Sequence, residues 1–110
     1  MLQHIQKWIK KMAELIITYW RDIPAQVTVK KGRKAARRPP PERFEQAIDM
    51  CAMRVGAKDT DAYLAEWRKG EPVSVGDDLE AEADKALEDI LLAYPQETVK
   101  TLIQNEGKAN

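Results

Sequence analysis

The segment LIITYWRDIPAQVTVKK, residues 15–31, decides the fold. Its first part, Leu15–Trp20, consists of residues that favour β-strands. Apolar and polar residues alternate over Ala25–Lys30, as expected for a strand with one buried face. Between the two parts Pro24 restricts the backbone, and the side chain of Asp22 is of the kind that caps turns. The pattern predicts a β-hairpin. Because a lone hairpin is only marginally stable, other elements must cover or extend it.

Helices are expected to provide this cover, so the predicted fold class is α+β: an N-terminal β-hairpin packed against three or four helices. Apolar residues recur at three- and four-residue spacing in four later stretches, at about 41–56, 59–70, 77–94 and 95–103. In the second stretch Asp59 or Thr60 is the expected N-cap, and Trp67 belongs to the apolar face.

The segments between the hairpin and these helices are predicted from the glycine, proline and capping residues that end or begin elements. Gly32 is expected to end the second strand, and the basic stretch after it is predicted to be a loop that runs into the prolines at 39–41. Residues 72–75 are expected to be extended and to form a third short strand at a sheet edge. Asp77 is the expected N-cap of the third helix, with Glu80 completing a capping box.

The chain of 110 residues is expected to hold one domain, at residues 12–105. Residues 1–11 form an amphipathic, basic N-terminal extension in which apolar residues recur at helical spacing. Three interpretations of this extension stay open: a helix that docks on a membrane surface or a partner, a helix packed on the domain itself, or an appendage of little consequence. Residues 106–110 are expected to be a disordered tail.

The charges balance overall but are segregated along the chain. There are 18 Lys and Arg residues against 18 Asp and Glu residues. Zero net charge argues against a general nucleic-acid binder, which depends on excess positive charge. Basic residues gather within 30–38, whereas acidic residues dominate 77–89. The molecule is therefore expected to be dipolar, and a dipole steers the approach of a charged partner.

Catalytic and metal-binding motifs are missing from the sequence. Cys51 is the only cysteine and lies on the apolar stripe of its helix, so we expect it to be a buried hydrophobe. The only histidine, His4, is remote from it in the sequence, and the two provide no ligand spacing. The sequence therefore favours a non-enzymatic protein without a cofactor. No stretch predicts a transmembrane helix or a signal peptide, and the expected location is the cytoplasm.

The basic segment is the first candidate binding site. Its six cations are Lys30, Lys31, Arg33, Lys34, Arg37 and Arg38. One interpretation is docking on an acidic protein surface, either an unidentified partner or the acidic helix of another copy in a homo-oligomer. A second is nucleic-acid binding, in which such cations often accompany exposed aromatic residues. A third is a solvated loop without a binding role.

Aromatic and charged residues near the predicted hairpin bend form the second candidate. Alternation places Tyr19 and Trp20 on opposite faces, so at most one of them is exposed. Arg21 and Asp22 are either a small recognition corner or, as the residues favour, a turn-capping Asp beside an exposed Arg. Trp67, followed by Arg68, is either a core residue or a platform for a ligand, and its helical spacing favours the core.

Four stretches of the sequence resemble a known family. YWRDIPAQV, RFEQAIDMCAMRVG, TDAYLAEWRKG and DLEAEADKALE occur in this order within residues 14–93 and are similar to the bacterial virulence factor family, typified by a domain of conserved virulence factor C. The motif positions that carry the resemblance are Tyr19, Trp20, Arg21, Asp22, Pro24, Phe44, Ala47, Ile48, Asp49, Trp67 and Arg68.

The resemblance implies a small standalone member of an alphaproteobacterial type. Larger members of the family combine the domain with an iron–sulfur scaffold-like module and helical repeats. The family brings no reaction and no catalytic residues, which favours an accessory, protein-binding role. Its association with one-carbon and folate genes leaves open an alternative role, an accessory subunit or small-molecule binder in that metabolism.

Overall fold

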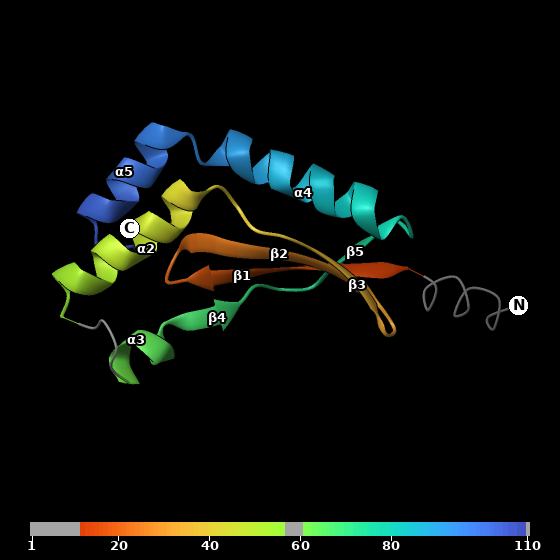
Figure 1. Ribbon diagram of the computed structural model, residues 1–110, viewed down its shortest axis with the longest axis horizontal. Helices are drawn as coiled ribbons and strands as arrows, with labels where there is room; N and C mark the ends of the chain where they lie inside the picture. Colours follow the sequence, from red (N-terminus) through yellow and green to blue (C-terminus); the bar gives the residue numbers. More distant parts are fainter. Residues whose placement is uncertain (1–11, 57–60, 110) are drawn as a thin grey trace, which may run out of the picture.

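The computed structural model describes residues 12–56 and 61–109, which form the predicted α+β fold (Figure 1). The predicted extension at 1–11 and the predicted cap at Asp59 or Thr60 lie outside the described residues. The elements are β1 (Ala13–Trp20), β2 (Ile23–Lys31), β3 (Lys34–Arg38), α2 (Glu42–Arg54), α3 (Asp61–Ala65), β4 (Trp67–Lys69), β5 (Val73–Val75), α4 (Leu79–Ala93) and α5 (Gln96–Gln104).

The predicted hairpin is confirmed, and it is the centre of a five-stranded sheet. β1 and β2 pair antiparallel, with Leu15 opposite Val29 and Ile17 opposite Val27. The strand order is β3-β2-β1-β4, and β5 pairs with the other half of β1. All of these pairings are antiparallel. The expected short strand at 72–75 is confirmed as β5. The hairpin therefore gains strand partners on both sides. These partners are needed because an isolated hairpin is only marginally stable.

The prediction of a loop after Gly32 was wrong. Gly32, with a φ of 61°, turns the chain, and Lys34–Arg38 returns as β3 along β2. Lys and Ala are depleted in strands on average, and the prolines at 39–41 follow directly, which made this stretch look like a loop. At an edge strand, however, only alternate side chains need burial, and Ala36 is the one residue of β3 that is buried. Backbone pairing with β2 thus outweighs the weak strand propensity of Lys and Ala.

The prediction of a helix up to Gly70 was also wrong in its second half. The helix α3 ends at Ala65, and Trp67–Lys69 continues as the strand β4. In this strand Trp67 lies opposite Trp20 and Lys69 lies opposite Thr18. The edge of β1 offers unpaired backbone groups here, and an aromatic residue such as tryptophan suits a strand as well as a helix.

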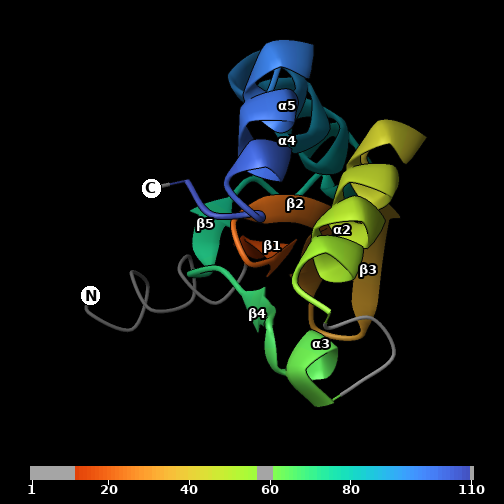
Figure 2. The ribbon, with the colours of Figure 1, turned by 90° about the vertical axis from the view of Figure 1, so that its left-hand side faces the viewer.

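Helices cover one face of the sheet, which we call the inner face. α4 runs along the sheet, while α2 and α5 lie side by side over one end of it (Figures 1 and 2). Buried residues from both layers meet between them: Ala13, Val27, Val29, Ala36, Phe44, Ala47, Ile48, Cys51, Ala52, Ala83, Ala86, Ile90, Val99 and Leu102. Asp78, one residue later than predicted, caps α4 by accepting a hydrogen bond from the amide of Ala81 at 3.1 Å.

Among residues 12–56 and 61–109, helix covers the opposite face, which we call the outer face, only at one end, where α3 lies (Figure 2). Residues opposite one another in paired strands point to the same side of the sheet. Thr18, Thr28 and Lys69 therefore share the outer face with their strand partners, and the side chains there are half-buried or exposed. The fold thus presents a largely polar sheet surface on the side away from α4.

Residues 106–109, which were expected to be a disordered tail, contact the hairpin turn instead. The carbonyl of Gly107 accepts a hydrogen bond from the amide of Asp22 at 2.8 Å. Gly107 has a φ of 89° and is buried against Trp20 and Arg21. The sequence of this segment did not predict the contact, because its residues are small or polar and Gly107 binds the turn through its backbone carbonyl.

Candidate functional site

The fold divides the six cations of the basic segment into two groups, and the first group faces α4. Lys31 Nζ lies 3.3 Å from Asp77 Oδ1. Arg38 donates from Nε to Asp84 Oδ1 at 2.7 Å and from Nη2 to Glu80. The hydrogen bonds that Arg38 donates to Glu80 and Asp84 raise the pKa of its guanidinium. These contacts join the edge of the sheet to the acidic helix of the same molecule, so these two cations are already neutralised.

The second group has no such partners. Lys30, Arg33, Lys34 and Arg37 are exposed, and within residues 12–56 and 61–109 none of them forms an ion pair. Arg37 lies opposite Thr28 and therefore shares the outer face, where Lys69 adds a further exposed cation. Glu14 lies opposite Lys30 and is the counter-charge on this face. Lys30 lies on the outer face as well, Lys34 lies opposite Lys31 and therefore points to the inner side, and Arg33 stands in the turn between the two strands. We call these four unpaired cations around the β2–β3 hairpin the basic surface.

The residues at the hairpin turn form a cluster that holds three segments together. Arg21 is not the exposed residue that was expected: its side chain is only 13% exposed, and its φ is 52°. Its Nη1 donates to the carbonyl of Glu106 at 2.8 Å, and its Nη2 lies 3.3 Å from Glu66 Oε2. Arg68 donates from Nη2 to Asp22 Oδ1 at 2.9 Å and from Nε to the carbonyl of Arg21. The cluster therefore secures the turn to β4 and to the C-terminal segment.

Asp22 binds the C-terminal segment, and this contact lowers the pKa of its carboxyl group. Its Oδ2 accepts a hydrogen bond from the amide of Ala109 at 2.7 Å. This bond, followed by the contact with Arg68, lowers the pKa of the carboxyl below its ordinary value. Hydrogen bonds and opposite charge favour the ionised form of a carboxylate. Asp22 thus stabilises the folded state while it is ionised.

Replacing Asp22 with asparagine is expected to lower the free energy of unfolding by about 1 kcal/mol at pH 7, a modest loss because the group is partly exposed. The folded-state pKa is depressed, so the stabilisation is present above the unfolded pKa of about 3.9 and is lost as the pH falls through the folded value. Urea unfolding between pH 7 and pH 2 measures this. The gap between wild type and variant closes at the acidic end, whereas a gap that stays constant would contradict the role of the charge.

The aromatic residues of the candidate site have different surroundings. Trp20 is fully buried, and its Nε1 donates to the carbonyl of Tyr63 at 3.0 Å. Tyr19 is half-buried on the opposite face, with the guanidinium of Arg68 4.5 Å from its ring centre. The two residues thus lie on opposite faces, as alternation predicts. Trp67 is 37% exposed rather than in the core, and its ring meets Tyr63 edge-on at 6.0 Å.

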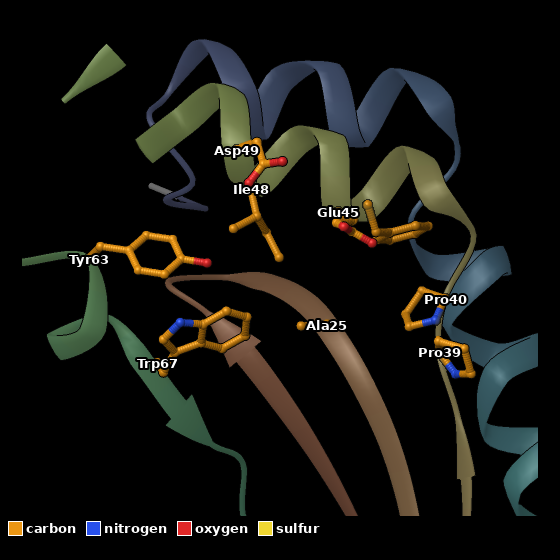
Figure 3. A pocket seen from close by; sticks show the side chains of 9 residues that line it. Ala25, Pro39, Pro40, Glu45, Ile48, Asp49, Tyr63 and Trp67 are labelled. Atoms are coloured by element: carbon orange, nitrogen blue, oxygen red, sulfur yellow. The ribbon is translucent and has the colours of Figure 1, made fainter. Parts of the chain in front are cut away.

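Sequence reasoning missed a cavity beside Trp67. It has a volume of about 300 Å³ and lies between α2, α3, β4 and the turn before α2 (Figure 3). Its lining residues are Ala25, Pro39, Pro40, Phe44, Glu45, Ile48, Asp49, Tyr63 and Trp67. They come from five separate segments, so no local pattern in the sequence indicates that they meet. Phe44, Ile48, Asp49 and Trp67 are nevertheless among the motif positions of the resemblance.

Cys51 is placed as the sequence predicted, on the buried side of α2. It is fully buried, and desolvation raises the pKa of its thiol. A thiol in such surroundings stays protonated and is a poor nucleophile. Cys51 therefore contributes packing.

Comparison with protein families decides the relationship of this chain. The model of the virulence factor family matches residues 18–103, which is most of the 110 residues. The chain belongs to the virulence factor family. This confirms the resemblance, and the matched region extends from β1 to α5. No curated protein and no solved structure matches the chain significantly.

The family region contains most of the features described above, but not the C-terminal segment that contacts the hairpin turn. The basic surface, the turn cluster up to Arg68 and the cavity all fall within residues 18–103 of this virulence factor domain. The family name describes an association with virulence and specifies no reaction. In the part of the chain that the structure describes, no helix has the length and apolarity needed to span a membrane.

Proposed function

We propose that this virulence factor domain is a non-enzymatic, cytoplasmic protein-interaction domain, and that its basic surface binds an acidic surface on a partner protein. The observation that carries the proposal is the division of the basic segment. Lys31 and Arg38 pair with α4, whereas Lys30, Arg33, Lys34 and Arg37 project from the β2–β3 hairpin without ion-pair partners among the described residues.

The geometry of the hairpin favours a protein partner. β3 is the last strand on its side of the sheet, and Arg37 and Lys34 stand on it. An extended acidic segment is able to pair with such an edge while its carboxylates meet the cations. Charges of this kind accelerate association and select partners by sign.

A matched pair of charge-reversal variants tests the proposal. The first variant carries Arg33→Glu and Arg37→Glu on the basic surface. The control carries Lys85→Glu and Lys100→Glu on α4 and α5, which changes the net charge by the same amount. The tagged proteins are used for affinity capture from nuclease-treated cell extract, and captured proteins are quantified by mass spectrometry. We expect the first variant to lose about ninety per cent of the specific partner, which is a loss of about 1.4 kcal/mol, and the control to retain it.

Nucleic acid is the alternative ligand, and the same two variants test whether the basic surface binds it. Fluorescence anisotropy with a labelled single-stranded oligonucleotide is recorded at low salt, where electrostatic binding is strongest. The proposal predicts that the wild type and the first variant do not differ in oligonucleotide binding. Oligonucleotide binding that depends on Arg33 and Arg37, together with equal protein capture by both variants, would overturn the proposal.

A further inference from the structure

The cavity beside Trp67 combines aromatic walls with negative charge. Tyr63 and Trp67 form one side, and their ring planes stand 86° apart (Figure 3). Glu45 and Asp49 lie on the other side, one turn apart on α2. Ala25 and the ring of Pro40 close the space between them. Two aromatic rings at right angles and two carboxylates define the chemistry of the cavity.

The carboxylates have no partner in the part of the chain that the structure describes. Neither Glu45 nor Asp49 forms a hydrogen bond or an ion pair through its side chain within residues 12–56 and 61–109. Asp49 is half-buried at this position. A neutral, apolar ligand would cover these carboxylates without satisfying them, which costs free energy. A positively charged ligand would satisfy them.

We propose that this cavity binds the cationic side chain, arginine or lysine, of a partner polypeptide. A cation is attracted to the faces of tryptophan and tyrosine and to the carboxylates at the same time. The volume of about 300 Å³ is at the small end for ligand sites, which fits one side chain and excludes a large cofactor. The proposal does not depend on the proposed function, because the charged and aromatic residues of this site lie on α2, α3 and β4 and select the opposite charge from the basic surface.

Nuclear magnetic resonance with a charged probe and its neutral isostere tests the site. The ¹⁵N-labelled chain is titrated with Nα-acetyl-arginine amide, and the indole N–H signal of Trp67 is followed. Nα-acetyl-citrulline amide has the same shape without the charge. We expect the arginine probe to shift the Trp67 signal saturably, and the citrulline probe to bind at least about tenfold more weakly, because charge-assisted hydrogen bonds are lost. Equal responses to the two probes, or no response to either, would overturn the proposal.

Replacing the two carboxylates with the amides of the same shape tests how much they contribute to binding of the arginine probe. The variant Glu45→Gln with Asp49→Asn is expected to weaken binding of the arginine probe about tenfold or more. The control, Glu88→Gln with Asp89→Asn on α4, removes the same charge at a distance and is expected to bind like the wild type. The remaining amide signals show whether each variant is folded. An unchanged affinity in the first variant would contradict the assignment.

A third probe separates a polypeptide ligand from a small cationic molecule. n-Propylguanidine carries the guanidinium group of the arginine side chain, with the same single charge, but no peptide bonds. The proposal predicts that it binds no more tightly than Nα-acetyl-arginine amide, because the amide groups add contacts at the rim of the cavity. Markedly tighter binding of n-propylguanidine would assign the cavity to a small cationic molecule and would overturn the polypeptide assignment.

Discussion

Replacing Trp20 with alanine is expected to lower the free energy of unfolding by about 3–5 kcal/mol, a large part of the 5–15 kcal/mol that is typical of a domain. The side chain is fully buried and contacts three segments. It donates to the carbonyl of Tyr63, lies 5.9 Å from the ring of Tyr63 and stacks with Arg21 at 5.2 Å. Truncation leaves a cavity and an unsatisfied carbonyl where β1, α3 and the C-terminal segment meet.

Urea unfolding followed by circular dichroism measures this loss, and Trp67→Ala is the control. Trp67 is a tryptophan on the neighbouring strand, directly opposite Trp20, but it is 37% exposed. Its truncation is expected to cost roughly half as much or less, because part of its surface already contacts water. Equal losses in the two variants would contradict the assignment of Trp20 as the core residue of this end of the sheet.

Replacing Gly107 with alanine is expected to lower the free energy of unfolding by about 2–4 kcal/mol, although the residue lies only three positions before Asn110. Its φ of 89° is unfavourable for any residue with a side chain. A Cβ atom would lie 3.3 Å from Cζ3 of Trp20 and 3.4 Å from Cδ of Arg21. The variant therefore adds backbone strain and a close contact to one position, and it weakens the attachment of the C-terminal segment to the turn.

Gly32→Ala separates the two contributions. Gly32 also has a left-handed φ, 61°, but a Cβ atom there would meet no other atom within 4 Å. Its replacement is expected to cost only the backbone term of about 1–2 kcal/mol. Thermal unfolding of both variants gives the comparison. If Gly107→Ala were no more destabilising than Gly32→Ala, residues 106–109 would not pack on Trp20 as described.

The parts of the fold that were predictable are those encoded by local periodicity. Alternation over 25–30 predicted β2, and the acidic start and apolar stripe of the third helix predicted α4. The burial of Cys51 followed from its place on the stripe of α2. In these segments the local propensity and the tertiary packing agree.

The parts that were missed depend on tertiary pairing. β3 contains three cations and one buried alanine, Ala36, and it is a strand only because β2 lies beside it. Trp67 and Arg68 fit a helical pattern as well as a strand, and the edge of β1 decides between them. The same pairing divides the basic segment, because alternation along β3 turns Arg38 towards α4 and Arg37 away from it.

The cavity depends on contacts between segments that are distant in the sequence. Glu45 and Asp49 share a helix face by their spacing, and this much is visible in the sequence. Their meeting with Tyr63 and Trp67 requires α3 and β4 to lie beside α2 at this end of the sheet. In the sequence, only the family motif positions on α2 and β4 indicated that these segments matter. They did not show which of the residues are core and which line a cavity.

Site-specific photo-crosslinking in living cells tests most directly whether the basic surface is a protein-binding site. A photoreactive phenylalanine analogue replaces Arg37, at the outer face of β3, or Lys85, on the helical layer, in separate experiments. We expect a defined protein adduct from position 37 and no such adduct from position 85. Adding Arg33→Glu is expected to reduce the adduct from position 37 strongly. The absence of an adduct at position 37, or adducts of equal yield at both positions, would contradict it.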